Sequence, residues 1–179
     1  VSLDHGHSWN VFQNGLPNVA VHDLVIQPEA KELVVGTHGR SIYKADISVL
    51  HNFNEYQHKA THLFKISNIR RSSRWGNSWS QWSPPTLPKL KFSIFSNAPK
   101  KATISVFSGA VKVTSFTTQL SKGFTFVNYD VSMSKKGRKA YLKANKKASI
   151  TTAKNGLYYL PIGTYTVKIG HVKQSFKVK

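Results

Sequence analysis

The sequence contains no cysteine, a single methionine and no hydrophobic run long enough to cross a membrane. Without cysteine, a disulfide scaffold and a thiolate metal site are both excluded. Acidic residues are also scarce, because 7 Asp and Glu stand against 26 Lys and Arg in 179 residues, which gives a formal net charge of +19. The 40% of hydrophobic residues nevertheless predicts a folded core and not a disordered basic tail.

Charge is distributed unevenly along the chain. Residues 1–55 hold six acids and three bases, whereas residues 56–179 hold 23 bases and one acid, Asp130. Seven of the eight histidines also lie in the first 62 residues. A step of this size predicts two units with different surroundings, joined by a connector.

The first nine residues contain a turn motif. Ser2, Asp4, Gly6 and Trp9 fit the pattern S-x-D-x-G-x-x-W, in which the carboxylate can accept backbone N–H groups across a tight turn. Gly6 provides a positive-φ position without a Cβ clash, and Trp9 is expected to cover the turn from the following strand. The motif resembles the Asp-box of sialidase-like (BNR) propeller blades.

Short strand patterns with polar turns between them follow this motif. The strands are predicted at residues 9–13, 19–26, 33–37 and 41–45. This rhythm is typical of a propeller blade. The stretch 15–48 resembles the last blade of WD40/YVTN/BNR-like repeat proteins, a secreted "glycosyl hydrolase-like" family related to the sortilin propellers, with Tyr43 where the family usually has Trp.

The resemblance implies that residues 1–50 are the last one to two blades of an incomplete β-propeller. The remaining blades are then expected upstream in a longer chain, and the protein is expected to be secreted or attached to a bacterial cell surface. Because one and a half blades cannot bury both faces of their sheets, residues 1–50 alone are expected not to fold.

A connector rich in tryptophan and arginine covers residues 51–88. In the favoured interpretation, its indoles pack in the joint between the propeller and the final domain, with guanidinium groups on their faces. In the other interpretation, they form a platform for a sugar or a polyanion. The residues concerned are Arg70, Arg71, Arg74, Trp75, Trp79 and Trp82.

Residues 89–179 alternate between apolar and polar side chains, beginning with Leu90, Phe92 and Ile94. Strands are predicted at 90–94, 104–106, 111–118, 124–131, 139–144, 164–169 and 172–178. Seven short strands separated by turn residues are typical of an immunoglobulin-like or fibronectin-like β-sandwich. The predicted class is therefore all-β, with terminal propeller blades followed by this sandwich.

The final domain carries two further resemblances. Tyr129-Asp130-Val131 and the stretch 161–167 are similar to the terminal domain of the propeller family, with Tyr129 in place of its Trp and with Ile162 inserted. Residues 160–179 are similar to the end of type IX secretion sorting domains of Bacteroidota. This similarity implies secretion machinery or a surface protein complex as a partner.

No catalytic, cofactor or metal set is recognised. A glycosidase needs two carboxylates about 5–10 Å apart, and Asp130 is alone in its half of the chain. In the first half, Asp23 and Asp46 have no recognisable acid–base setting. The histidines lack cysteines or regularly spaced carboxylates beside them, so they are expected to be structural. If the larger protein is an enzyme, its catalytic residues are expected upstream.

A lysine-rich cluster is predicted around a polar turn and a following strand. It consists of Lys135, Lys136, Arg138, Lys139, Lys143, Lys146 and Lys147. Such a cluster either attracts polyanions or only keeps the surface soluble. Solubility is favoured because lysine outnumbers arginine nineteen to four in residues 56–179. Nucleic acid is not the expected partner, since no helix-turn-helix, RNP or OB signature is present; anionic glycans fit better.

These patterns predict a non-catalytic structural and interaction module at the C-terminal end of a secreted or cell-surface Asp-box propeller protein. Two alternatives stay open. One is an accessory glycan-binding module of a carbohydrate-active enzyme. The other is a module that binds lipopolysaccharide or another polyanion.

Overall fold

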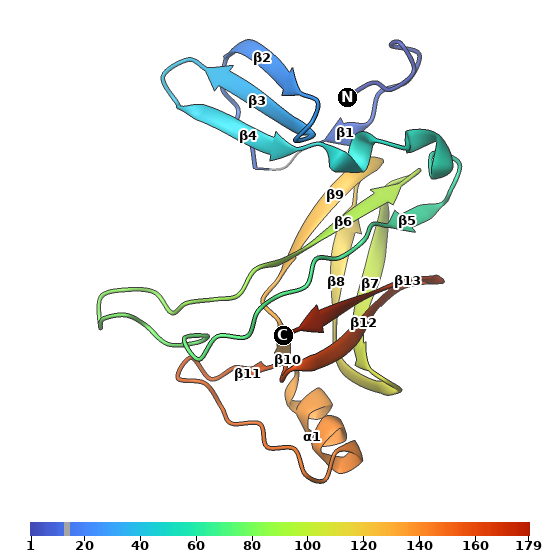
Figure 1. The fold of residues 1–179 in the computed structure, drawn as a ribbon. Helices are drawn as coiled ribbons and strands as arrows, with labels where there is room; N and C mark the ends of the chain where they lie inside the picture. Colours follow the sequence, from blue (N-terminus) through green and yellow to red (C-terminus); the bar gives the residue numbers. More distant parts are fainter. Residues whose placement is uncertain (13–14) are drawn as a thin grey trace.

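The structure, a computed structural model, describes residues 1–12 and 15–179. The chain is mostly β-strand with one α-helix, as predicted for the all-β class (Figure 1). The elements are β1 (Val11–Phe12), β2 (Val21–Gln27), β3 (Glu32–Thr37), β4 (Ile42–Asp46), the 3₁₀ helices η1 (Ser48–Leu50) and η2 (Phe53–Glu55), β5 (Thr61–Leu63), β6 (Leu90–Ser96), β7 (Lys100–Ser108), β8 (Val111–Leu120), β9 (Gly123–Tyr129), β10 (Ser132–Met133), α1 (Lys135–Ala144), β11 (Tyr158–Tyr159), β12 (Gly163–Ile169) and β13 (Val172–Val178).

Two four-stranded sheets face each other in the centre of the molecule. One has the order β1-β9-β6-β5 and the other the order β13-β12-β7-β8. Side chains of both sheets, including Phe92, Ile94, Ile104, Val106 and Val167, are fully buried in one shared core. Sheets that share a core in this way form a β-sandwich, which we call the sandwich below.

Strand β6 shows why the alternating pattern predicts this layer. Leu90, Phe92 and Ile94 are buried, whereas Lys91 between them is largely exposed. Successive side chains point to opposite faces of a strand, so one face enters the core, while the other is exposed at Lys91 and covered farther along at Phe95. Six of the seven strands predicted in this half are confirmed.

The seventh prediction, a strand at 139–144, is wrong because these residues belong to α1. The helix begins after Ser134, whose hydroxyl accepts a hydrogen bond from the N–H of Gly137 at 2.9 Å. Tyr141 and Leu142 then pack against the sandwich core. The basic cluster thus surrounds a helix, and a six-residue window is too short to separate a helical from a strand period.

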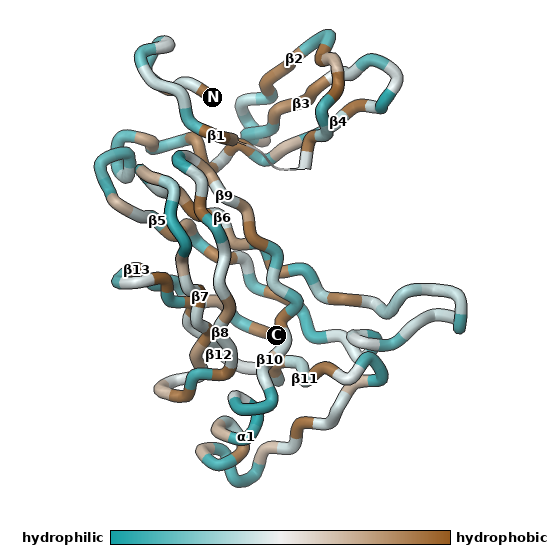
Figure 2. Tube along the Cα trace, turned by 180° about the vertical axis from the view of Figure 1, so that it is seen from behind, coloured by the Kyte–Doolittle hydropathy of each residue, from teal (hydrophilic) through white to brown (hydrophobic). Residues whose placement is uncertain are grey.

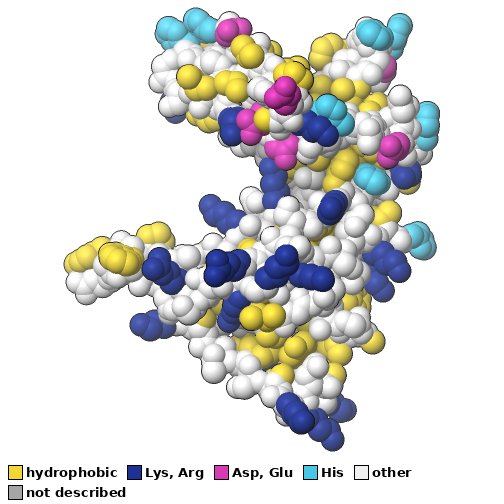
Figure 3. Space-filling view, in the orientation of Figure 1, with side chains coloured by type: hydrophobic (Ala, Val, Ile, Leu, Met, Phe, Trp, Pro, Cys, Tyr) yellow, Lys and Arg dark blue, Asp and Glu magenta, His cyan; other side chains and the backbone are white. Residues whose placement is uncertain are grey.

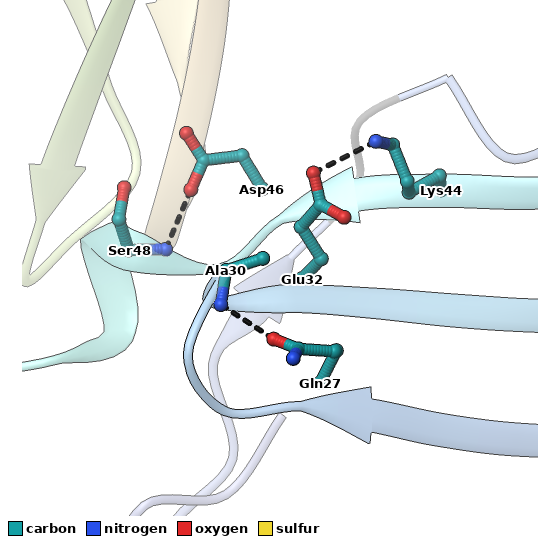
Figure 4. A network of polar contacts seen from close by, with 6 residues as sticks. All are labelled: Gln27, Ala30, Glu32, Lys44, Asp46 and Ser48. Carbon is teal, nitrogen blue, oxygen red and sulfur yellow. Dashed lines mark hydrogen bonds and ion pairs between the residues drawn. The ribbon is translucent and has the colours of Figure 1, made fainter.

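A smaller sheet of β2, β3 and β4 lies beyond one end of the sandwich (Figures 1 and 2). Its strands confirm three of the strands predicted in the first half. Polar contacts fix its end near the sandwich (Figure 4): Lys44 pairs with Glu32 across the sheet at 2.8 Å, and the Asp46 carboxylate accepts the N–H of Ser48 at 2.8 Å, where β4 passes into η1. We call β2–β4 the smaller sheet.

An aromatic cluster holds the segment after β4 on the sandwich. Tyr56, Phe95 and Phe124 are buried together, with ring centroids of Tyr56 and Phe95 5.2 Å apart. The Tyr56 hydroxyl donates a hydrogen bond to the carbonyl of Val49, and burial raises the pKa of Tyr56 to about 12. The segment after β4 is therefore anchored on the β6–β9 sheet.

Strand β1 belongs to the sandwich and not to the smaller sheet. It runs parallel to β9, with Val11 opposite Gly123 and Phe12 opposite Phe124. A Cβ at Gly123 would lie 2.6 Å from the nitrogen of Val11, so this approach requires glycine. The strand predicted at 9–13 was expected to belong to a propeller blade, but it pairs with β9 of the sandwich instead. Residue 13, its last, and residue 14, the first of the turn predicted at 14–18, lie outside the described residues.

Charged side chains are segregated along the molecule. Figure 3 shows Asp, Glu and His mainly over the upper part of the molecule, around the smaller sheet, the N-terminal turn and the segment after β4, and Lys and Arg mainly over the sandwich and the segments below it. No helix within the described ranges is long and apolar enough to cross a membrane.

Candidate interaction surfaces

The turn motif at residues 2–8 is built around the Asp4 carboxylate. Its Oδ1 accepts the hydroxyl of Ser2 and the N–H of Ser8, both at 2.9 Å, and its Oδ2 accepts the Ser8 hydroxyl at 2.6 Å. Gly6, with φ of +90°, donates its N–H to the Ser2 hydroxyl at 2.8 Å. The Ser8 hydrogen bonds are the main reason that the pKa of Asp4 is lowered to about 2. This carboxylate therefore holds the turn as an anion.

Trp9 does not cover this turn as expected. Its side chain is 69% exposed, although the neighbouring Asn10 is buried and Val11 already lies in the sandwich sheet. The chain leaves the turn toward β9, so the indole remains in solvent. Trp9 is an exposed aromatic at the acidic end of the molecule.

The connector separates into a buried part and an exposed part. Trp75 is buried in the sandwich core, where its ring lies 5.6 Å from that of Tyr159. The Arg71 guanidinium lies 4.9 Å from the centre of the Trp75 ring and donates from Nη1 to the carbonyl of Leu160 at 3.2 Å. Desolvation lowers the pKa of Arg71. Trp75 is therefore buried in the sandwich, and Arg71, which is partly exposed to solvent, lies against it.

Trp79 and Trp82 do not take part in this packing. They lie in the long loop between β5 and β6, which projects from the sandwich (Figure 1), and they are 90% and 87% exposed. Arg70 and Arg74, on the way into the loop, are exposed too. The interpretation that the indoles pack inside the protein therefore applies to Trp75. The interpretation that they form a ligand platform can apply only to Trp79 and Trp82.

The basic cluster also contains residues of two kinds. Arg138 donates from Nε and Nη2 to the carbonyl of Ile150, at 3.1 and 2.9 Å, and its guanidinium lies 4.8 Å from the ring centre of Tyr158. It therefore joins α1 to the following segment. The other members are exposed: Lys135, Lys136, Lys139, Lys143, Lys146 and Lys147.

An apolar strand in the smaller sheet is a surface that the sequence interpretation did not single out. Leu24, Val25 and Ile26 of β2 are 58%, 56% and 62% exposed, and Figure 2 shows this strand as hydrophobic along much of its length. Alternation places Leu24 and Ile26 on one face and Val25 on the other. Strand β2 thus presents apolar side chains on both faces.

The histidines make ring contacts with neighbouring side chains. His22 and His38 stack at 5.0 Å in the smaller sheet, and His62 stacks on Tyr56 at 5.0 Å. Burial lowers the pKa of His62. Within residues 1–12 and 15–179, no group of three or more His, Cys, Asp or Glu could hold a metal ion.

Comparison of the chain with protein-family models, with curated proteins and with solved structures finds no match. A function is therefore to be sought in the three exposed surfaces: the β2 strand, the two outer indoles and the lysines around α1.

Proposed function

We propose that the chain is a non-catalytic structural and interaction region of a secreted or cell-surface bacterial Asp-box propeller protein. In this proposal the smaller sheet is part of a propeller blade and the sandwich is an immunoglobulin-like domain attached to it. The exposure of Leu24, Val25 and Ile26 carries the proposal. A strand that is apolar on both faces and open on both faces is suited to lie between two further layers, as a blade does between its neighbours.

The strand order of the sandwich supports the immunoglobulin-like part of the proposal. With β5, β6, β7, β8, β9, β12 and β13 labelled A, B, C, C′, E, F and G, the two sheets have the orders A-B-E-β1 and C′-C-F-G. Apart from β1, this groups the strands as in immunoglobulin-type sandwiches. The hydroxyl of the buried Tyr165, on strand F, donates to the carbonyl of Pro161 at 2.8 Å. A tyrosine that bonds to the backbone just upstream is a recurring feature of such domains.

Photo-crosslinking from β2 tests the proposal. A benzophenone amino acid is placed at position 24 of the protein produced by its own cells, and the culture medium, surface and cytosol fractions are analysed. We expect the protein in the surface or medium fraction, at a mass above 20.1 kDa, with a crosslink inside that same polypeptide or to one surface protein. The same amino acid at Glu29, in the polar turn after β2, is the control and should give no crosslink. A 20.1 kDa protein confined to the cytosol, or no crosslink from position 24, would contradict the proposal.

The two alternatives each have a surface that favours them. A glycan-binding module would use the exposed Trp79 and Trp82, since indole faces stack on sugar rings. A polyanion-binding module would use the exposed lysines of α1 and its following turn. Retention on heparin that is unchanged between low and high salt would argue against the polyanion alternative.

A further inference from the structure

The loop between β5 and β6 carries two exposed indoles on an ordered tip. Its outer turn is closed by hydrogen bonds in which the N–H of Ser83 donates to the carbonyl of Ser80 at 3.2 Å and the N–H of Ser80 donates to the Ser83 hydroxyl at 2.8 Å. Trp82 lies within this turn and Trp79 directly before it. We call residues 76–87 the tryptophan loop. The loop projects from the sandwich (Figure 1), and apolar side chains lie at the end of this projection (Figure 3).

The tryptophan loop is fixed beside the basic segment that follows α1. The N–H of Asn155 donates to the carbonyl of Gly76 at 3.1 Å, at the base of the loop. Trp79 and Lys154 line the same surface depression. Figure 1 shows the segment from α1 to β11 running along the molecule toward this loop. Lys154 is thus the lysine beside the loop, and the exposed Lys146 and Lys147 lie at the other end of the same segment, directly after α1.

Negative charge is almost absent from this part of the chain. Asp130 is the single acid in residues 56–179, and its carboxylate accepts the N–H and the hydroxyl of Ser132 at 3.0 and 2.7 Å. No carboxylate lies in the tryptophan loop or between α1 and β11, whereas Lys146, Lys147 and Lys154 lie between α1 and β11. The composition favours an anionic partner over a neutral one.

We propose that the tryptophan loop, together with Lys146, Lys147 and Lys154, docks on the surface of an anionic phospholipid bilayer. Indoles prefer the boundary between headgroups and acyl chains, because the ring is apolar and its N–H is polar. A projecting tip can insert there, while Lys154 beside the loop and the two lysines after α1 contact anionic headgroups on the same membrane surface. This docking goes beyond the sheet contact proposed above and does not depend on it.

Vesicle flotation of the full chain tests this proposal. Vesicles of phosphatidylcholine alone are compared with vesicles of equal parts phosphatidylcholine and phosphatidylglycerol. We expect binding to the anionic vesicles with a blue shift of tryptophan fluorescence, and a loss of affinity of about tenfold or more in Trp79→Ser/Trp82→Ser. Trp9→Ser is the matched control, since it removes another exposed indole from the acidic end, and it should bind like the parent. Melting curves establish that the variants are folded.

Two double variants with reversed charges distinguish the contribution of these lysines to vesicle binding from the effect of net charge. Lys146→Glu/Lys154→Glu should weaken binding about tenfold or more, whereas Lys59→Glu/Lys101→Glu, with the same change in net charge on exposed residues elsewhere, should change it much less. Equal binding by the parent and Trp79→Ser/Trp82→Ser would overturn the proposal. So would equal binding to neutral and anionic vesicles, or indole-dependent binding to dextran sulfate without binding to vesicles, which would assign the loop to an anionic glycan.

Discussion

The smaller sheet and the sandwich both contain apolar strands, but these strands are exposed in the first and buried in the second. Ile104 and Val106 of β7 are fully buried, whereas Leu24 and Ile26 of β2 are mostly exposed. The difference lies in what faces each strand: β7 is covered by a second four-stranded sheet, while the smaller sheet is covered only in part, near Phe12. A strand pattern is thus a local property, but burial requires a second layer.

The largest expected effect comes from truncating a core residue. Phe92→Ala should lower the free energy of unfolding by about 4 kcal/mol, because it removes a fully buried ring and leaves a cavity. Leu24→Ala, in the smaller sheet, should change it by less than about 0.5 kcal/mol. Urea unfolding followed by circular dichroism measures both. Equal losses would mean that β2 is buried as deeply as the sandwich core.

The next effect tests how closely α1 lies on the sandwich. A Cβ on the buried Gly137 would lie 1.7 Å from the carbonyl oxygen of Val113 in β8. Gly137→Ala should therefore displace the helix and destabilise the protein by about 3 kcal/mol. Gly109→Ala is the control, because nothing lies within 4 Å of its added Cβ and only its left-handed backbone, with φ of +56°, is strained, at a cost of about 1 kcal/mol. If thermal melting ranks the two variants the other way, the helix is not in this contact.

A smaller effect is expected at the start of α1. Ser134→Ala removes the acceptor for the N–H of Gly137 and should cost about 1 kcal/mol. Ser134→Thr should restore the lost stability, since its hydroxyl can accept from the N–H of Gly137 and donate to the carbonyl of Val113 as serine does. Melting temperatures of the two variants check this order, and an alanine variant as stable as the parent would show that the cap is dispensable.

The smallest effect concerns the turn motif at residues 2–8, which lies outside the smaller sheet and outside the sandwich. The pKa of Asp4 is lowered to about 2, so ionised Asp4 stabilises the folded turn. This contribution is complete above the ordinary Asp pKa of about 4 and is lost as the pH falls toward 2. Ser8→Ala removes the main cause and should raise the pKa of Asp4, as followed by NMR titration of its carboxyl carbon. A pKa that stays near 2 in this variant would contradict the assigned cause.

The strands could be predicted from the sequence because alternation is a short-range signal. Leu90, Phe92 and Ile94 fix the face of β6 without knowledge of the rest of the chain. The partner of a strand is a long-range property, so the pairing of β1 with β9 could not be predicted. The helix could have been predicted from the sequence, because Ser134 is a favourable N-cap residue directly before it.

The candidate surfaces were predictable by residue type but not by exposure. Trp75 and Trp79 have the same side chain four positions apart, yet one enters the core and the other points to solvent. Their difference depends on the neighbouring Tyr159 and on the contact between Gly76 and Asn155, which come from segments about 80 residues away in the sequence. A linear pattern contains no such information.

Because charge is segregated along the molecule, ionic strength should affect both its stability and its binding to other surfaces. The Lys44–Glu32 ion pair lies in the smaller sheet, and Asp130 is the single acid in residues 56–179, so the many lysines of the sandwich outnumber the acids near them and repel one another. Added salt shortens the range of this repulsion, to about 10 Å at 0.1 M. The same salt should therefore make the sandwich more resistant to unfolding and release the protein from an anionic bilayer, so that cohesion and adhesion respond to it with opposite signs.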